Sequence, residues 1–120
     1  LHACVLRQDN TWQLTEVECS GIRLWLCAPE QPVGTALRLR IEARDVSLSL
    51  DPSARSSIQN RLPCTVREVL DTAHPAQRLL RLECQGQTLW ARLTARSVHE
   101  LALAAGSDVW AQIKAVAVLD

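Results

Sequence analysis

The chain has 120 residues, a length that suits one ordinary domain or two very small ones. Its 13 acidic and 13 basic side chains balance to zero formal charge, which argues against binding nucleic acid or an anionic membrane by bulk charge. No apolar run approaches the ~18 residues of a membrane-spanning helix, and no signal peptide opens the chain. Because the first residue is Leu1 and not methionine, we expect a piece excised from a longer protein.

An internal repeat divides the chain into two related segments. The aligned pairs are residues 1–5 with 62–66 (a looser match), 19–25 with 84–90, and 34–43 with 106–115. The join falls between residues 51 and 60. The sequence therefore predicts a degenerate first unit over residues 1–55 and a second unit over residues 56–120.

The first unit has the pattern of short strands. Ser20 and Gly21 form a two-residue hairpin signal between apolar runs, with glycine supplying the positive φ that such turns need. Residues 37–43 then alternate apolar with charged side chains, which predicts a strand with one solvated face. From Val46 the apolar residues fall on the opposite parity, and a β-bulge in one long strand would produce that shift.

The second unit repeats these signals and adds a helix. Gln85 and Gly86 form the matching turn, and the parity slip recurs where residues 109–115 give way to Val116. Residues 94–103 predict a short helix with a capping box between Ser97 and Glu100. The expected fold is all-β, with two tandem small barrels and one short helix in the second.

Five scattered cysteines carry no metal or disulfide pattern: Cys4, Cys19, Cys27, Cys64 and Cys84. No two of them have C-x-x-C spacing, and none of the three histidines lies near them in a ligand arrangement. We therefore expect buried free thiols in a reducing compartment.

Catalytic motifs are absent from the sequence. None of the four glycines stands in a phosphate-loop context, and no nucleophile elbow occurs. His99 falls on the polar side of the expected helix, where a solvated surface histidine is the simpler interpretation. We do not expect enzyme activity from this chain alone.

Lys114 is the exception among the basic residues, because the other twelve are arginines. Lysine is a compact charge suited to a small round anion, whereas arginine prefers planar partners. By strand parity Lys114 faces away from Ile113, so a lysine on a solvated strand face is the alternative. Hydroxyl and amide donors for a tetrahedral oxyanion are available at Ser56, Ser57, Asn60 and Thr94, and the helix N-terminus adds a further favourable feature. The matching position in the first unit holds Glu42, which would repel an anion.

Three separated motifs resemble the molybdate-binding MOP domain, a barrel of the TOBE type with the oligomer-binding (OB) fold. They are Ser-Ile-Gln-Asn-Arg-Leu-Pro at 57–63, Leu-Thr-Ala-Arg-Ser-Val-His-Glu-Leu at 93–101, and Val-Trp-Ala-Gln-Ile-Lys-Ala at 109–115. The resemblance covers residues 56–119. Residues 40–48 and 56–60 are also similar to the C-terminal regulatory region of the ATP-binding subunits of bacterial molybdate importers. Two OB-like units, the first a degenerate relative, follow from this resemblance.

The resemblance implies the ligand and the residues that hold it. Molybdate or tungstate would be bound, often at a subunit interface, by five residues: Ser57, Asn60, Thr94, Lys114 and Ala115. No catalytic residue, bound metal or other cofactor is implied. The chain departs from the family pattern at Gln59, where an arginine is usual, and at Val116 and Ala117, where hydroxyl residues often stand.

The resemblance also implies a regulatory role and partners. We expect a homodimer that senses intracellular molybdate, joined to an N-terminal ATPase domain and a membrane permease, in the cytoplasm at the inner face of the membrane. Two alternatives stay open: a cytoplasmic molybdate store or molybdate-responsive regulator, and a dimerisation module that binds no ligand.

Nucleic-acid binding is a further possibility for an OB-like barrel, but it needs aromatic platforms in a basic groove. We interpret the four tryptophans as packing residues instead, since Trp25 and Trp90 occupy equivalent places in the two units. No nucleic-acid partner is expected.

Overall fold

The computed structural model describes residues 1–28, 30–51 and 55–119, which form two compact units. Unit 1 consists of Leu1–Arg40 and the residues from Val116 onward, and unit 2 is Ile41–Ala115. The expected boundary between residues 55 and 56 follows the sequence repeat, whereas the compact units follow spatial contacts. The chain thus crosses from one unit to the other twice, at residues 40–41 and 115–116.

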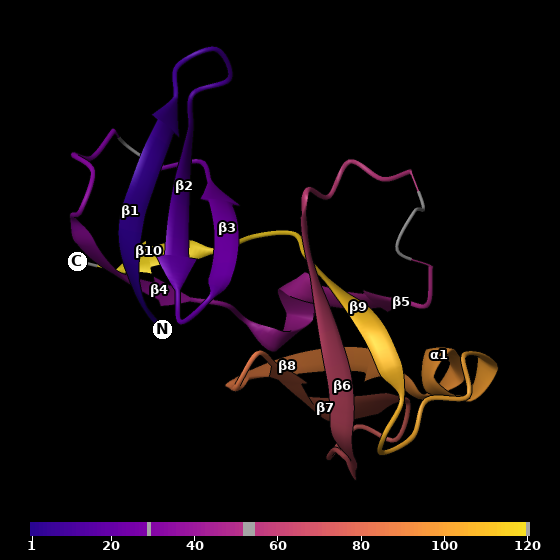
Figure 1. Cartoon of the computed structure of the whole chain (residues 1–120). Helices are drawn as coiled ribbons and strands as arrows, with labels where there is room; N and C mark the ends of the chain where they lie inside the picture. Colours follow the sequence, from indigo (N-terminus) through magenta and orange to yellow (C-terminus); the bar gives the residue numbers. More distant parts are fainter. Residues whose placement is uncertain (29, 52–54, 120) are drawn as a thin grey trace. The chain divides into compact units, whose positions relative to one another are not determined.

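Unit 1 is an antiparallel sheet of five strands (Figure 1). In spatial order the strands are β10 (Ala117–Leu119), β4 (Ala36–Arg40), β1 (His2–Asp9), β2 (Leu14–Cys19) and β3 (Ile22–Leu26). Alternate residues of these strands point to one face, because side chains in a strand have a period of two. The buried set on this face includes Val5, Val17, Leu24 and Leu39.

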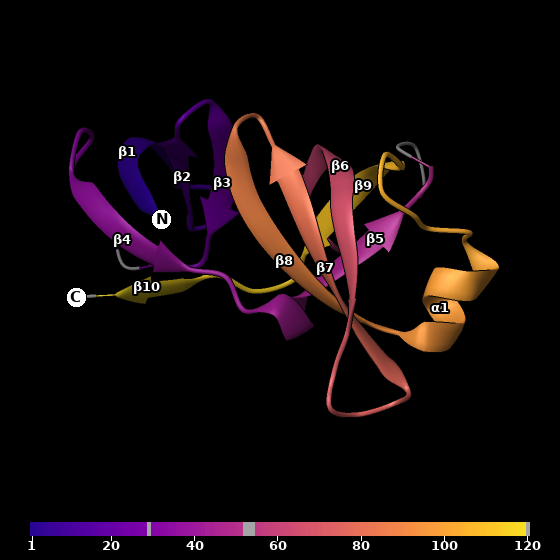
Figure 2. The same ribbon diagram turned by 90° about the horizontal axis from the view of Figure 1, so that it is seen from below.

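Unit 2 is a second five-stranded antiparallel sheet, with two short helical segments. The strands, in spatial order, are β5 (Val46–Ser49), β9 (Asp108–Ile113), β6 (Asn60–Asp71), β7 (Gln77–Cys84) and β8 (Gln87–Thr94). The 3-10 turn η1 (Ala43–Asp45) precedes β5, and the helix α1 (Ala95–Glu100) follows β8 (Figure 2). β8 packs against η1 and β5, so the sheet curls back on itself around its core. The all-β prediction, with one short helix in the second unit, is confirmed.

The predicted hairpin turns are present in both units. β2 and β3 are joined by Ser20 and Gly21, with φ of 49° and 89°, and β7 and β8 by Gln85 and Gly86, with φ of 50° and 81°. Positive φ at both central residues is the signature of the type I′ turn, which matches the twist of the flanking strands.

The repeat also extends to backbone hydrogen bonds. In unit 1 the Val5 N–H donates to the Thr35 carbonyl and the Val5 carbonyl accepts from Gly34 N–H, at 2.9 and 2.8 Å. In unit 2 Val66 makes the same pair of bonds with Ser107 and Gly106, at 2.8 and 2.7 Å. The pairing register shifts just after each of these valines, between Val5 and Arg7 and between Val66 and Glu68. Equivalent bulges therefore bend β1 and β6.

The parity slips have a different cause from the bulge that the sequence predicted. β4 ends at Arg40, η1 intervenes, and β5 then pairs with β9 of unit 2. Likewise β9 ends at Ile113, and β10 pairs with β4 of unit 1. Figure 1 shows the exchange by colour, because the yellow β10 lies with indigo and purple strands. The prediction of bulged long strands was wrong, since the chain changes sheets at these points.

The helix begins one turn earlier than its expected capping box. Thr94, not Ser97, is the N-cap residue, and its hydroxyl oxygen accepts a hydrogen bond from the Ser97 N–H at 3.1 Å. Arg96 and Glu100 form an exposed ion pair at 2.9 Å across one turn of the helix. The expected pairing of Ser97 with Glu100 as a capping box was therefore wrong.

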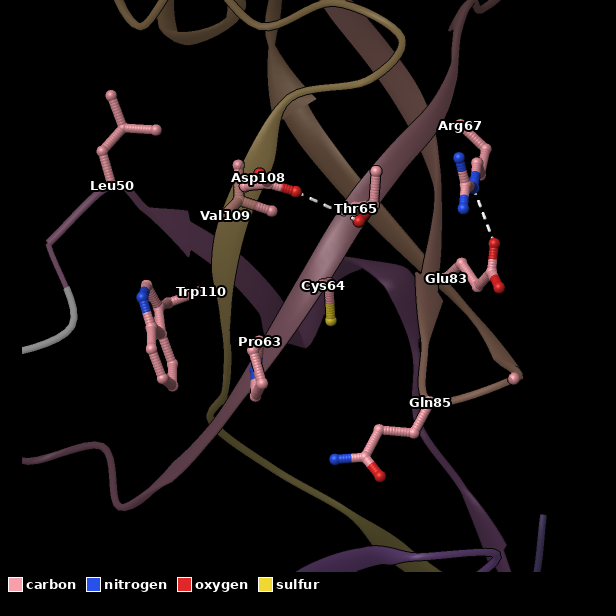
Figure 3. Close-up of a pocket in the computed structure, with 11 residues that line it drawn as sticks. Leu50, Pro63, Cys64, Thr65, Arg67, Glu83, Gln85, Asp108, Val109 and Trp110 are labelled. Carbon is pink, nitrogen blue, oxygen red and sulfur yellow. Dashed lines mark hydrogen bonds and ion pairs between the residues drawn. The ribbon is translucent and has the colours of Figure 1, made fainter.

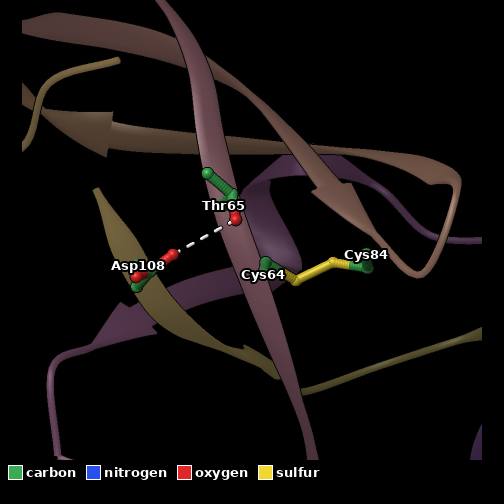
Figure 4. The surroundings of a disulfide bond; sticks show 4 residues. All are labelled: Cys64, Thr65, Cys84 and Asp108. Carbon is green, nitrogen blue, oxygen red and sulfur yellow. Dashed lines mark hydrogen bonds between the residues drawn. A yellow bond between two sulfur atoms is a disulfide. The ribbon is translucent and has the colours of Figure 1, made fainter. Parts of the chain in front are cut away.

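The prediction of buried free thiols was wrong for four of the five cysteines and is confirmed only for Cys19. Cys64 and Cys84 form a disulfide between β6 and β7 (Figure 4), while Cys19 is a buried free thiol and Cys4 and Cys27 are exposed. Sequence spacing gave no sign of this bridge, because the register of two strands brings the residues together.

The tryptophans do not fill the cores. Trp12 is 74% exposed and Trp90 is 38% exposed, while Trp25 and Trp110 are half-buried. The Arg7 guanidinium lies 5.1 Å from the centre of the Trp25 ring and bonds Glu16 at 3.1 Å. Aliphatic residues build both cores instead.

Candidate functional site

Lys114 and Ala115 follow the last residue of β9 and are both exposed. Ile113, immediately before them, is 1% exposed, so the lysine side chain faces away from the core as strand parity predicts. The Lys114 N–H donates to the Asp45 carbonyl of η1 at 2.9 Å. This bond holds the backbone at the point where the exposed Lys114 side chain leaves the chain.

Asn60 lies beside the end of β9, opposite the residue that precedes Lys114. It is the first residue of β6 and pairs with Ile113 of β9. Asn60 is half-buried and interacts with other residues of the chain. The end of β9 and the start of β6 thus bring together two residues that are separated by more than fifty positions in the chain.

Ser57 lies in the leading segment, residues 56–59, just before β6. Two hydrogen bonds shape this segment: the Ile58 N–H donates to Ser56 Oγ at 3.1 Å, and Arg61 Nε donates to the Ile58 carbonyl at 3.2 Å. Three residues of extended chain span at most about 10 Å, so exposed Ser57 is confined to the neighbourhood of Asn60. Ser57, Asn60, Lys114 and Ala115 therefore lie at the same end of unit 2.

Thr94 lies elsewhere. It is the last residue of β8 and pairs with Gln77, next to the end of β6, whereas Asn60 is at the start of that 12-residue strand. Figures 1 and 2 both show α1 and the stretch after β9 at different ends of the unit. The Thr94 hydroxyl caps α1 and also donates to Ser97 Oγ at 2.9 Å. Within one chain, the structure does not bring Thr94 to the other four residues.

Glu42, the counterpart of Lys114 in the repeat, lies in unit 2 just before η1. Its carboxylate accepts from Arg44 Nε at 2.8 Å, and its carbonyl accepts from the Asp45 N–H at 2.9 Å. The Asp45 carbonyl also accepts from the Lys114 N–H. Asp45 therefore links the two backbones, and Glu42 lies close to the backbone of Lys114. Arg44 offsets the negative charge of Glu42 close to the candidate anion site.

A hollow of about 510 Å³ in unit 2 was missed by sequence reasoning (Figure 3). It is lined mainly by side chains of β6, β7 and β9, including Thr65, Arg67, Glu83, Asp108 and Trp110. Arg67 is bound to Glu83 at 2.6 Å, and Thr65 Oγ1 donates to Asp108 Oδ1 at 3.2 Å. Because its arginine is paired and Asp108 is acidic, the hollow does not favour an oxyanion. The sequence signal for this hollow is the alternation in β6, where residues 63, 65 and 67 point outward between the buried Leu62, Cys64 and Val66.

No group of three or more His, Cys, Asp or Glu side chains within residues 1–28, 30–51 and 55–119 could hold a metal ion. Over the same residues, none of the helices has the length and apolar character needed to cross a membrane.

Comparison with known proteins gives consistent matches. The TOBE domain family matches residues 56–119. The molybdenum import ATP-binding protein ModC of Thiobacillus denitrificans is 48% identical over 119 residues, 99% of this chain and 33% of its own. ModC 1 of Azotobacter vinelandii is 44% identical over the same length and with the same coverage. This chain thus spans about a third of the length of the curated relatives it matches.

A solved structure also shares the fold over almost the whole chain. It is that of the cytoplasmic molybdate-binding protein ModG with molybdate bound, and it is 23% identical to this chain. The match covers 98% of this chain and 92% of ModG, with a TM-score of 0.76. The likeness supports the two-unit β architecture.

Proposed function

Since the chain belongs to the TOBE domain family, we propose that it binds molybdate or tungstate as the regulatory domain of a molybdate importer's ATP-binding subunit. The observation that carries the proposal is the match along 99% of this chain to ModC of Thiobacillus denitrificans at 48% identity. The grouping of four motif residues at one end of unit 2 supports it independently.

The chemistry of these residues suits a tetrahedral oxyanion. Lys114 supplies a flexible positive charge, Ser57 a hydroxyl donor, Asn60 an amide donor and Ala115 a backbone N–H. Each is a hydrogen-bond donor, and charge-assisted bonds to an anion are roughly twice as strong as neutral ones. In this proposal no metal or organic cofactor takes part, and the anion itself is the ligand.

A second copy of the chain would complete the site. Thr94 lies far from Lys114 within one chain, so a binding role for both residues requires two sites or two chains. We propose a homodimer in which the Thr94 end of one copy approaches the Lys114 end of the other. This arrangement would make the dimer sensitive to the anion, because only the assembled site offers every donor.

Regulation follows if the anion prefers one arrangement of the importer. A ligand with equal affinity for two states shifts neither, so binding must differ between the transporting and resting forms. We propose that intracellular molybdate stabilises the resting form. The partners in this proposal are an N-terminal ATPase domain and a membrane permease, with the regulatory domain on the cytoplasmic side.

The test is the substitution Lys114→Ala. We expect molybdate affinity, measured by titration calorimetry, to fall at least tenfold while the far-ultraviolet circular dichroism stays unchanged. Arg23→Ala is the matched control, because it removes one exposed positive charge from β3 of unit 1 and should leave affinity unchanged. Unchanged affinity in Lys114→Ala would overturn the site assignment.

Ligand identity is tested by thermal shift with molybdate, tungstate, sulfate and phosphate at equal concentration. A ligand that binds only the folded chain raises its melting temperature by mass action. The proposal predicts shifts with molybdate and tungstate that exceed those with sulfate and phosphate. If none of the four anions gives a shift, the departures at Gln59, Val116 and Ala117 would favour the second candidate, a dimerisation module without a ligand.

A further inference from the structure

The disulfide of unit 2 joins directly opposed residues of β6 and β7. Thr65 pairs with Glu83, and the same register places Cys64 opposite Cys84, with their Cα atoms 4.6 Å apart (Figure 4). Directly opposed residues that do not exchange backbone hydrogen bonds lie about 4.5 Å apart in an antiparallel pair. Both cysteines are buried, with exposed fractions of 5% and 0%.

Unit 1 shows that the fold does not require this bridge. Cys4 pairs with Glu18 in β1 and β2, so the same register places Ala3 opposite Cys19. Ala3 and Cys19 are therefore the counterparts of Cys64 and Cys84, and they too are buried, with exposed fractions of 3% and 4%. The same hairpin and the same bulge form in unit 1 with a single thiol, Cys19, at these two positions and no bridge between them.

Residues next to the bridge belong to two functional features of unit 2. Pro63 and Thr65 flank Cys64 and line the hollow, and Gln85 follows Cys84 and lines it too (Figure 3). Cys64 is also on the same strand as Asn60, four residues away. Two unbonded sulfur atoms need more room than two bonded ones, so reduction must loosen the contact between β6 and β7.

We propose that Cys64 and Cys84 are a reversible redox pair, which exchanges with low-molecular-weight thiols and disulfides and sets the stability of unit 2. The reduced form keeps the hairpin that unit 1 forms without a bridge, and the oxidised form holds β6 and β7 together. The proposal does not depend on the anion site, and it concerns a pair of side chains that the proposed function leaves unused.

The exchange is balanced with a small disulfide, RSSR, as the oxidant. The Cys64 thiolate, the more exposed of the two, attacks one sulfur of RSSR, forming a mixed disulfide and releasing RS⁻. The Cys84 thiolate then attacks the Cys64 sulfur, forming the internal bridge and releasing the second RS⁻. The two protein thiols lose two protons and two electrons, and two molecules of RSH are formed. An excess of RSH drives the same steps in reverse.

Thiol counting tests the pairing. After equilibration with oxidised glutathione and denaturation, we expect Cys4, Cys19 and Cys27 to be recovered as thiols or as glutathione mixed disulfides, compared with five titratable thiols after reduction. Peptide mapping should join residue 64 to residue 84. Five titratable thiols after oxidation, or a bridge that contains Cys19, would overturn the proposal.

Stability and amide exchange test the consequence. The oxidised protein should melt at a temperature roughly 5 °C or more above that of the reduced protein. Amide hydrogens in residues 64–67 and 82–85 should exchange at least tenfold faster after reduction, whereas those of β1 and β2 should not change. Equal melting temperatures and equal exchange in the two redox states would contradict the proposal.

Two variants provide matched controls. Cys84→Ser should melt at one temperature in oxidising and reducing buffer, and Cys19→Ser should keep the full difference between the two. If Cys19→Ser abolishes that difference, the assignment to unit 2 is wrong. Should Cys84→Ser fail to fold, the comparison of oxidised with reduced wild-type protein still decides the question.

Discussion

Two of the five candidate residues, Thr94 and Lys114, differ in how far their side chains are already engaged. Thr94 resembles a family anion ligand, yet its hydroxyl both accepts from the Ser97 N–H and donates to Ser97 Oγ. A hydroxyl has two acceptor lone pairs, so capping the helix leaves one pair, and its proton could turn toward an anion only by leaving Ser97. Lys114 differs, because its backbone N–H donates to the Asp45 carbonyl while its side chain is exposed.

Removing the Thr94 hydroxyl separates these roles. Thr94→Ala should lower the free energy of unfolding by about 1 kcal/mol, because α1 loses its N-cap, and Thr94→Ser should retain most of that stability. Urea unfolding measures both effects. Unchanged stability in the alanine variant would show that the cap contributes nothing, and lost molybdate affinity in the serine variant would point to the threonine methyl group.

At the scale of elements, the sequence predicted what depends on neighbouring residues. The two hairpin turns, Ser20–Gly21 and Gln85–Gly86, require two adjacent positive φ angles. This requirement is local, and the glycine in each pair indicates it in the sequence. The cap at Thr94 was misplaced by one turn, because Ser97 and Glu100 offered an equally good local pattern. The bulge in β6 is visible in the sequence as a change of apolar parity from Val66 to Val69. The longer apolar runs changed parity at residues 46 and 116, and the bulges were predicted there instead.

Features that depend on register could not be predicted in this way. Cys64 meets Cys84, and Asn60 lies beside Ile113, only because three strands pair at fixed positions. Composition singled out Lys114, the family resemblance completed the set of candidate anion residues, and the structure then grouped four of them and separated Thr94. The spacing of residues along the chain does not determine which strands pair with each other.

The register equivalence of the two units predicts an engineered bridge. Ala3→Cys should form a disulfide with Cys19 and raise the free energy of unfolding by about 3 kcal/mol, the value for a closed loop of about 15 residues. Denaturant unfolding of oxidised and reduced protein measures the gain, and Ala3→Ser is the control that cannot form the bridge. A Cys19 that still reacts with thiol reagents in the oxidised, denatured variant would show that the registers are not equivalent.

At the scale of the whole molecule, unit 1 obtains one edge strand from beyond its main segment. β10 follows every strand of unit 2 along the chain, yet it pairs with β4 of unit 1, with Arg40 opposite Ala117 and Arg38 opposite Leu119. β5, which the sequence repeat assigns to the first unit, belongs to unit 2 and pairs with β9. The stability of unit 1 thus depends on residues that the sequence repeat assigns to the second unit.

Replacing residues 117–119 with Gly-Ser-Gly tests this dependence. We expect faster amide exchange in β4 and β1, because β4 loses its outer neighbour, and unchanged exchange in β6 and β7. Replacement with Val-Thr-Val should preserve protection, since these residues favour strands. Equal protection of β4 in both variants would mean that β10 adds nothing to unit 1.

The late position of β10 has a consequence for the order of folding during synthesis. β1 to β4 leave the ribosome first, but the strand that completes their sheet is made only after all of unit 2. Such a distant pairing is slow to form, because a long loop must close before the contact is gained. The half of the molecule that is synthesised first should therefore be the last to reach its final form, and until then the bare edge of β4 is open to pairing with another chain.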